Sequence, residues 1–188
     1  MAGTGEDRVL LTVGHGTLDR DGLGTLLREA GIGRLVDVRR FPGSRNNPAA
    51  QQPALEQMTA DLGIDYRWDE RLGGRRRLTA DEPEPDTWWR VAQFRAYAAW
   101  TRTPEFRAGL ERLLHDVGAA RPAVMCSEAV WWRCHRRLVA DVVRAEHVLP
   151  VLHLMHDGRL TSHTVSEGAR AGDDRRLVWD GPTASDDS

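Results

Sequence analysis

Short, mostly apolar runs alternate along the chain with longer segments in which apolar residues recur every three or four positions. Short apolar runs rich in β-branched side chains are typical of strands buried on both faces. Five such runs are present: Val9–Val13, Leu35–Val38, Ile64–Trp68, Ala123–Cys126 and Val148–Met155. Because helical segments separate them, the pattern predicts an α/β fold, a single three-layer Rossmann-like sandwich with a mainly parallel sheet of about five strands.

The periodic segments predict helices over residues 17–30, 54–62, 87–100, 104–117 and 129–146. Thr103 can cap the fourth of these helices, with Pro104 at the first helical position. The fifth is expected to be a long helix, because apolar residues recur every four positions along it. Its buried face would consist of Val130, Cys134, Leu138 and Val142.

The length of 188 residues and the mass of 21.1 kDa fit one domain. We assign residues 1–160 to a single α/β domain and expect 161–188 to be a C-terminal extension with a frayed acidic tail. No apolar run approaches the ~20 residues that cross a bilayer, and the acidic start lacks the order of a signal peptide. We therefore expect a cytoplasmic protein without a membrane partner.

Cysteine content and charge narrow the function classes. Cys126 and Cys134 are too few for a disulfide scaffold, so both are candidates for chemistry or for core packing. The net charge of −2 and the pI of about 6.4 argue against bulk electrostatic binding of nucleic acid. A local basic patch is still compatible with this net charge, so nucleic acid remains a possible partner.

Candidate site residues follow the predicted strands. In open parallel sheets, ligands bind beyond the carboxyl ends of the strands, where loops and helix N-termini converge. His15 and Arg39 follow the first two strands, while Cys126 and Glu128 stand at the end of the fourth. We expect these four side chains to line one crevice.

Four short motifs occur in order along the chain: Thr12-Val13-Gly14-His15, Leu35-Val36-Asp37-Val38-Arg39 with Pro42 and Ser44-Arg45, Leu72-Gly73-Gly74, and Cys126-Ser127-Glu128 leading to Cys134-His135-Arg136. Together they resemble the bacterial family called domain of unknown function 488, over roughly residues 9–156. The resemblance implies an α/β fold and brings no established reaction. It assigns the family's motif positions to His15, Arg39, Arg45, Cys126, Glu128, Cys134, His135 and Arg136. Gly16 and the pair Trp131-Trp132 depart from the usual pattern and would reshape the pocket.

Cys126 is the first candidate for chemistry. It ends a strand and precedes a predicted helix whose free N–H groups and dipole would favour a thiolate, the useful nucleophile. A small buried cysteine at a strand end is the competing interpretation. Cys126 and Arg133 stand as C-x6-R, a poor match to the C-x5-R phosphate loop of cysteine phosphatases. His15 is a candidate acid or base, or simply hydrogen-bonds its own loop.

Metal binding is a further alternative. Cys126, Cys134 and His135, with His15, are suitable ligand types, but C-x7-C-H is not a standard zinc spacing. Adjacent residues in a helix also point about 100° apart. We therefore favour core packing for Cys134 and expect no cofactor and no tightly bound structural zinc. If a metal is present, its ligands are Cys126, Cys134 and His135.

Two function classes follow from these residues. In the first, the chain is an enzyme acting on a small phosphate- or nucleotide-like anion. Its catalytic residues would be Cys126, His15 and Glu128. Its ligand-binding residues would be Arg39, Ser44, Arg45, Arg136 and Trp132. In the second class, the arginines and tryptophans form a non-catalytic module that binds nucleic acid or a nucleotide. The reactivity of Cys126 discriminates between the two.

Overall fold

The computed structural model describes residues 8–43, 46–79, 81 and 83–181. Its central sheet has six strands in the order β3-β2-β4-β1-β5-β6. The strands are β1 (Leu10–Gly14), β2 (Arg34–Asp37), β3 (Asp65–Trp68), β4 (Pro122–Cys126), β5 (Val151–Leu154) and β6 (Leu160–Ser162). The first five are parallel and β6 runs antiparallel to β5. The predicted mainly parallel, Rossmann-like sheet is confirmed, with one further edge strand.

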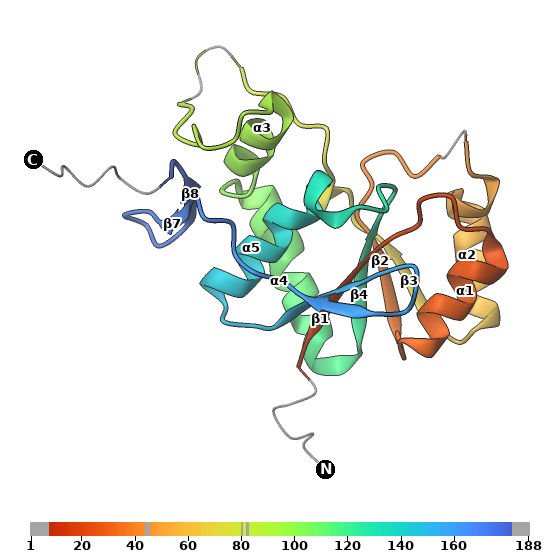
Figure 1. Ribbon diagram of the computed structural model, residues 1–188. Coiled ribbons are helices and arrows are strands. Elements are labelled where there is room, and N and C mark those ends of the chain that lie inside the picture. Colours follow the sequence, from red (N-terminus) through yellow and green to blue (C-terminus); the bar gives the residue numbers. More distant parts are fainter. Residues whose placement is uncertain (1–7, 44–45, 80, 82, 182–188) are drawn as a thin grey trace, which may run out of the picture.

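Helices cover both faces of the sheet (Figure 1). One face packs against α1 (Arg20–Glu29) and α2 (Gln52–Asp61), the other against α4 (Pro104–Ala119) and α5 (Arg136–Glu146), with α3 (Ala92–Trp100) beside them. Successive residues of β1 face opposite sides, so that Leu10 belongs to one apolar cluster and Leu11 to the other. No helix in the described part of the chain is both long and apolar enough to cross a membrane.

Two helices begin five or more residues after their predicted starts. The fifth begins at Arg136 rather than at residue 129, because the preceding segment forms a short 3-10 turn, η4 (Trp131–Arg133). There the Trp131 ring stacks flat on His153 of β5 at 3.9 Å between centroids, a tertiary contact that outweighs local helical periodicity. The helix expected from residue 87 begins at Ala92, since the backbone N–H of Trp88 donates to Trp179 O at 2.9 Å. The predicted cap by Thr103, which accepts from the Phe106 backbone N–H, is confirmed.

The segment after β6 returns to the body of the protein. Strands β7 (Ala169–Ala171) and β8 (Leu177–Trp179) form a small antiparallel sheet at the end of the molecule opposite α1 and α2 (Figure 1). Trp179 is fully buried and belongs to the apolar cluster on the α5 side. Its Nε1–H donates to Asp141 Oδ2 at 2.9 Å, which ties β8 to α5. The expected acidic tail lies outside the described residues.

Candidate functional site

A pocket of about 910 Å³ lies at the carboxyl ends of β1, β2 and β4. The four side chains expected at one crevice, His15, Arg39, Cys126 and Glu128, all line it. Further lining residues come from the loop after β2, the segment before α3, the first turn of α3 and the segment between β4 and α5: Arg40, Phe41, Gly43, Asn46, Gly74, Arg75, Gln93, Phe94, Ser127, Arg133, Cys134 and His135. The parallel topology therefore brings residues far apart in sequence to one place.

Gly14 allows β1 and β4 to bring their ends together. A Cβ atom at Gly14 would lie 1.9 Å from the backbone oxygen of Glu128, so only glycine fits there. Beyond it, the His15 N–H donates to Cys126 O at 3.0 Å and the Gly16 N–H to Ser127 O at 3.0 Å. The backbone thus fixes His15 beside Cys126.

Two thiols and an imidazole form a cluster in the pocket wall. His135 Nδ1 lies 3.8 Å from Cys126 Sγ and 3.6 Å from Cys134 Sγ. The donor atoms of the three side chains all lie within 4.8 Å of one another. The Tyr97 ring packs on the imidazole at 4.9 Å between centroids, and a Cβ at Gly74 would lie 2.7 Å from His135 Nδ1. The ring therefore has little freedom to move.

The pKa values of the two cysteines are shifted in opposite directions. The pKa of Cys126 lies well below its ordinary value, first because Cys134 donates a hydrogen bond to its sulfur, and further because His135 and Arg136 stabilise negative charge; burial opposes the shift. Burial, followed by that same hydrogen bond, raises the pKa of Cys134. The expected source of the Cys126 shift was wrong in part, because the turn η4 separates Cys126 from the N-terminus of α5.

Arg39 lines the pocket but its donors are already engaged. Its Nε and Nη2 donate to the two oxygens of Asp37 at 2.8 and 2.6 Å, and its Nη1 donates to Ala50 O at 2.7 Å. Tyr66 also donates to Asp37, at 2.8 Å. This arginine therefore holds the end of β2 in place and has little capacity left for an anion.

His15 is positioned as a neutral imidazole. Burial lowers its pKa, and nearby Arg39 lowers it further. Its Nδ1 lies 2.9 Å from Gly16 O, a carbonyl that can only accept, so the ring proton is assigned to Nδ1. Its Nε2, 3.4 Å from Arg39 Nη1, is then an acceptor. The side chain can take up a proton at Nε2.

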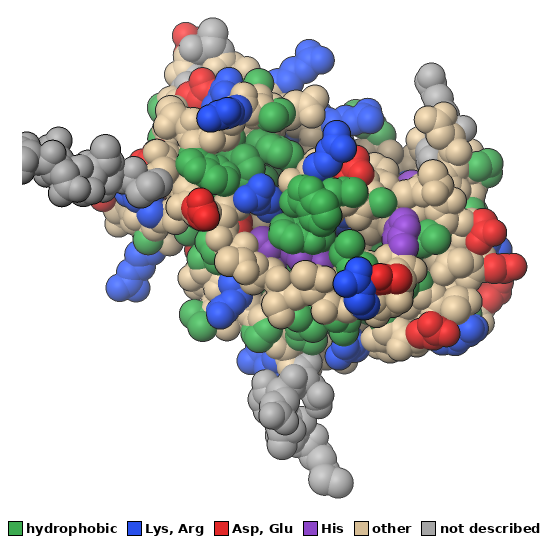
Figure 2. Space-filling view, viewed as in Figure 1, with side chains coloured by type: hydrophobic (Ala, Val, Ile, Leu, Met, Phe, Trp, Pro, Cys, Tyr) green, Lys and Arg blue, Asp and Glu red, His purple; other side chains and the backbone are tan. Residues whose placement is uncertain are grey.

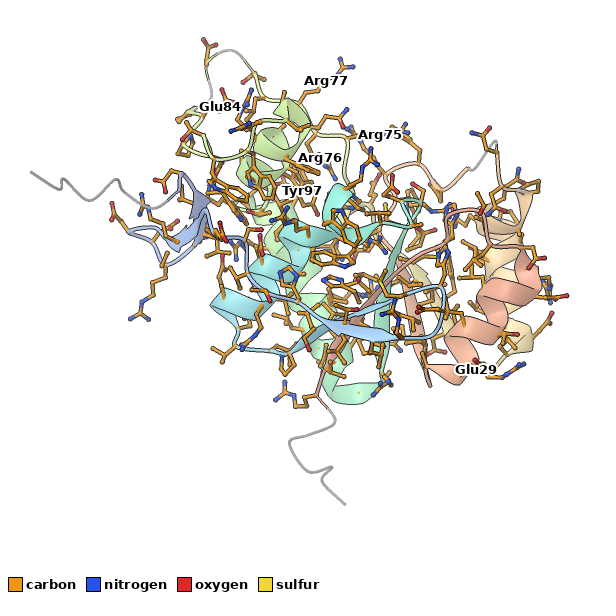
Figure 3. All side chains as sticks on the ribbon, in the orientation of Figure 1. Glu29, Arg75, Arg76, Arg77, Glu84 and Tyr97 are labelled. Atoms are coloured by element: carbon orange, nitrogen blue, oxygen red, sulfur yellow. The ribbon has the colours of Figure 1, made fainter. Side chains whose placement is uncertain are left out.

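Three other arginines at the pocket form no ion pair with a described carboxylate. Arg40, Arg75 and Arg133 line the pocket, and none forms an ion pair with the described part of the chain. All blue side chains in Figure 2 are arginines, since the chain has no lysine, and several stand along the upper edge over α3. Arg76 and Arg77 continue this line beside α3 (Figure 3). In the sequence, the run of three arginines from Arg75 to Arg77 is the signal that indicates a cationic set able to hold an anion.

Two of the remaining predicted ligand-binding residues, Arg136 and Trp132, do not line the pocket. Arg136 is 1% exposed, and its Nη2 donates to Glu128 O at 2.5 Å, so it supports the turn after β4 from inside. Trp132 is 47% exposed and packs edge-on against Trp131, outside the pocket lining. Ser44 and Arg45 lie outside the described residues.

Fold and pocket together define a Rossmann-like α/β protein with a thiol–imidazole cluster at the carboxyl edge of its sheet. The chain belongs to the family described as Domain of unknown function DUF488, which matches residues 20–143. The family resemblance drawn from the motifs is thereby confirmed. No curated protein and no solved structure matches the chain.

Proposed function

We propose that the protein is an enzyme that binds a small phosphate- or nucleotide-like anion in this pocket and depends on the Cys126 thiol for its reaction. The observation that carries the proposal is that anion-binding groups and potentially reactive groups line the same pocket. Arginines without described carboxylate partners share one pocket with two thiols and an imidazole. Guanidinium groups bind phosphate and carboxylate oxygens through paired hydrogen bonds, and a thiolate is the reactive form of cysteine.

The other lining residues fit defined roles in this proposal. Arg75 and Arg133 hold the anion, because Arg39 is neutralised by Asp37. His15 takes up a proton at Nε2. Glu128 is the sole carboxylate among the described lining residues, and its Oε1 accepts one long bond, from the Val130 N–H at 3.3 Å. It is therefore available to exchange a proton with a bound ligand.

Calorimetric titration with pyrophosphate tests the anion site. Replacing Arg75 or Arg133 by Gln should weaken binding about tenfold each, because each loses a charge-assisted hydrogen bond of about 1.5 kcal/mol. Arg144→Gln, the same change on an exposed turn of α5, is the matched control and should bind like wild type. Equal affinity of all four proteins would contradict the proposal.

Turnover of a panel of phosphate esters and nucleotides tests the role of the thiol. Cys126→Ser should still bind pyrophosphate but lose at least about 100-fold in turnover. Ser127→Ala, a neighbouring change that keeps both thiols, is the control. If Cys126→Ser turns over any substrate as fast as wild type, the reaction does not depend on this thiol.

A second candidate function is that of a nucleic-acid-binding module. It is favoured by arginines that continue from this pocket into two neighbouring ones. Arg40 lines this pocket and two others of about 1050 and 350 Å³. Arg76 and Arg77 line both of the others, and Arg76 lies 3.7 Å over the Trp100 ring. Phe41, which is 62% exposed, lies between the first two. Arginines interleaved with aromatic rings suit a single strand with stacked bases.

Fluorescence anisotropy with a labelled single-stranded oligonucleotide at several salt concentrations tests this second candidate. Arg77→Gln should weaken binding and reduce the slope of log affinity against log salt by about one. Oligonucleotide binding together with slow, equal iodoacetamide labelling of Cys126 and Cys134 would favour the module over the enzyme.

We further propose a cytoplasmic location. The two free thiols support it, because Cys126 and Cys134 lie close enough to contact the same imidazole, and reducing compartments keep such thiols from oxidising. Alkylation in intact cells followed by mass spectrometry should find both cysteines reduced.

A further inference from the structure

We propose that Cys126, Cys134 and His135 bind a zinc ion at the wall of the pocket. In tetrahedral zinc sites, Zn–S bonds of about 2.3 Å and Zn–N bonds of about 2.0–2.1 Å set ligand sulfur and nitrogen about 3.5 Å apart. His135 Nδ1 lies 3.6 and 3.8 Å from the two sulfurs, and the three donor atoms lie within 4.8 Å of one another. The ligand atoms therefore already have nearly the spacing that zinc requires.

The backbone around Cys134 and His135 allows both side chains to reach Cys126, although the C-x7-C-H spacing is not a standard one for zinc. Cys134 has an extended backbone, with φ −118° and ψ 150°, and α5 begins only at Arg136. Cys134 and His135 are therefore not successive residues of a regular helix, and both side chains reach the end of β4, where Cys126 lies. The expectation of no tightly bound zinc rested on the irregular ligand spacing and, in part, on a helix that does not extend over these residues.

The donor set and its surroundings suit zinc. Two thiolates and an imidazole are ligands that Zn²⁺ prefers, and two thiolates balance its charge. Among the described residues, Nδ1 of His135 faces the two sulfurs at 3.8 and 3.6 Å, so its lone pair is directed to the place that a metal would occupy between them. Tyr97 and Gly74 hold the ring in the orientation that turns Nδ1 to the thiols.

The fourth coordination position would face the pocket. No fourth His, Cys, Asp or Glu among the described residues joins the cluster, whereas all three members line the pocket. Three protein ligands with one further position are typical of catalytic zinc sites, and four protein ligands of structural ones. The inference therefore deepens the proposed function: Cys126 would serve the reaction as a zinc ligand, and an oxygen of water or of the bound anion would complete the coordination.

Metal titration of the full-length protein tests this site. Metal-free protein should bind one Zn²⁺ per chain in competition with a chromophoric chelator. With Co²⁺, the wild type should show the charge-transfer absorption of thiolate ligands. Cys126→Ser, Cys134→Ser and His135→Ala should each weaken zinc binding by more than about 100-fold. His147→Ala removes an exposed histidine away from the pocket and should bind zinc like wild type.

The outcomes separate this inference from the proposed function. Wild-type protein that binds neither metal, or variants that keep wild-type zinc affinity, would overturn the zinc site whatever pyrophosphate does. Should the variants fail to fold, the Co²⁺ spectrum of the wild type decides, since absence of the thiolate band would overturn the site and its presence would support it. Zinc binding without any pyrophosphate binding would leave this site standing and would overturn the anion site alone.

Discussion

The protein contains two clusters of polar side chains on the α5 side of its sheet, and their hydrogen bonding differs. In the first, a chain of bonds runs from Thr12 Oγ1 to His153 at 2.7 Å, from His153 to His163 at 3.0 Å, and from His163 to Asp141 at 2.8 Å. Asp141 also accepts from Trp179 Nε1 and from a backbone N–H. Every member is buried and bonded. The second cluster is the pocket, where the buried Nε2 of His135 has no partner in the described part of the chain.

This difference separates polar groups that hold the fold from polar groups that serve a ligand. A buried network with all its partners present resists change, because each loss leaves another group unsatisfied. Arg75 and Arg133, in contrast, have no described carboxylate to lose. We therefore expect substitutions in the Asp141 network to change the free energy of unfolding, and substitutions in the pocket to change ligand binding.

The largest effect is expected for Asp141→Ala. It removes a fully buried carboxylate that accepts from His163, the Ser166 N–H and Trp179, so three donors lose their partner. The free energy of unfolding should fall by about 3–5 kcal/mol in urea denaturation. Asp157→Ala, which breaks an exposed pair with Arg159, should leave the midpoint unchanged. Equal midpoints for the two variants would show that the network does not hold the fold.

Acid should destabilise the protein through His153. Burial lowers its pKa from 6.5 to about 3, with His163 and Arg136 adding to the shift. The unfolded chain therefore takes up a proton as the pH falls below about 6.5, while folded His153 stays neutral, so the folded state loses at most about 1.4 kcal/mol per pH unit from this group. Unfolding free energies measured from about pH 6.5 to pH 4 should fall steadily. The slope should be shallower in His153→Gln, and an identical slope would assign the loss to other groups.

Trp179→Phe should have an intermediate effect. Phenylalanine keeps most of the apolar contact but cannot donate to Asp141 Oδ2, so the unfolding free energy should fall by about 1–3 kcal/mol. Trp132→Phe makes the same change at a side chain that is 47% exposed and serves as the control. If both variants unfold at the same urea concentration, the bond from β8 to α5 contributes nothing measurable.

The smallest change in stability is expected for Arg133→Gln. The side chain is exposed and has no described ion pair, so the unfolding free energy should stay within about 0.5 kcal/mol of wild type. Arg136→Gln is the comparison, because Arg136 is 1% exposed and supports the backbone of Glu128, and it should destabilise the protein clearly. A large loss of stability in Arg133→Gln would mean that the pocket arginines also hold the fold.

Local patterns in the sequence determined most of the strands of the sheet, and they determined that the pocket lies at the carboxyl ends of those strands. Apolar runs indicated β1, β2, β4 and β5, because strands covered by helices must be apolar on both faces, whereas β3 lies at the edge of the sheet and its residues are exposed or half-buried. Strand order along the chain then placed His15 and Cys126 at one edge, since parallel strands all end on the same side. The antiparallel β6 left no such signal, because all three of its residues are exposed.

Only the tertiary structure decided how the thiol cluster is built and which arginines are free. The four-residue period through Cys134 predicted a helix, yet Trp131 stacks on His153, and the turn that results places Cys134 and His135 beside Cys126. The sequence correctly placed Arg39 at the carboxyl edge of the sheet, but in the structure its guanidinium donates to both carboxylate oxygens of Asp37. Periodicity reports which side of an element is buried, whereas these contacts depend on side chains from separate segments competing for the same partners.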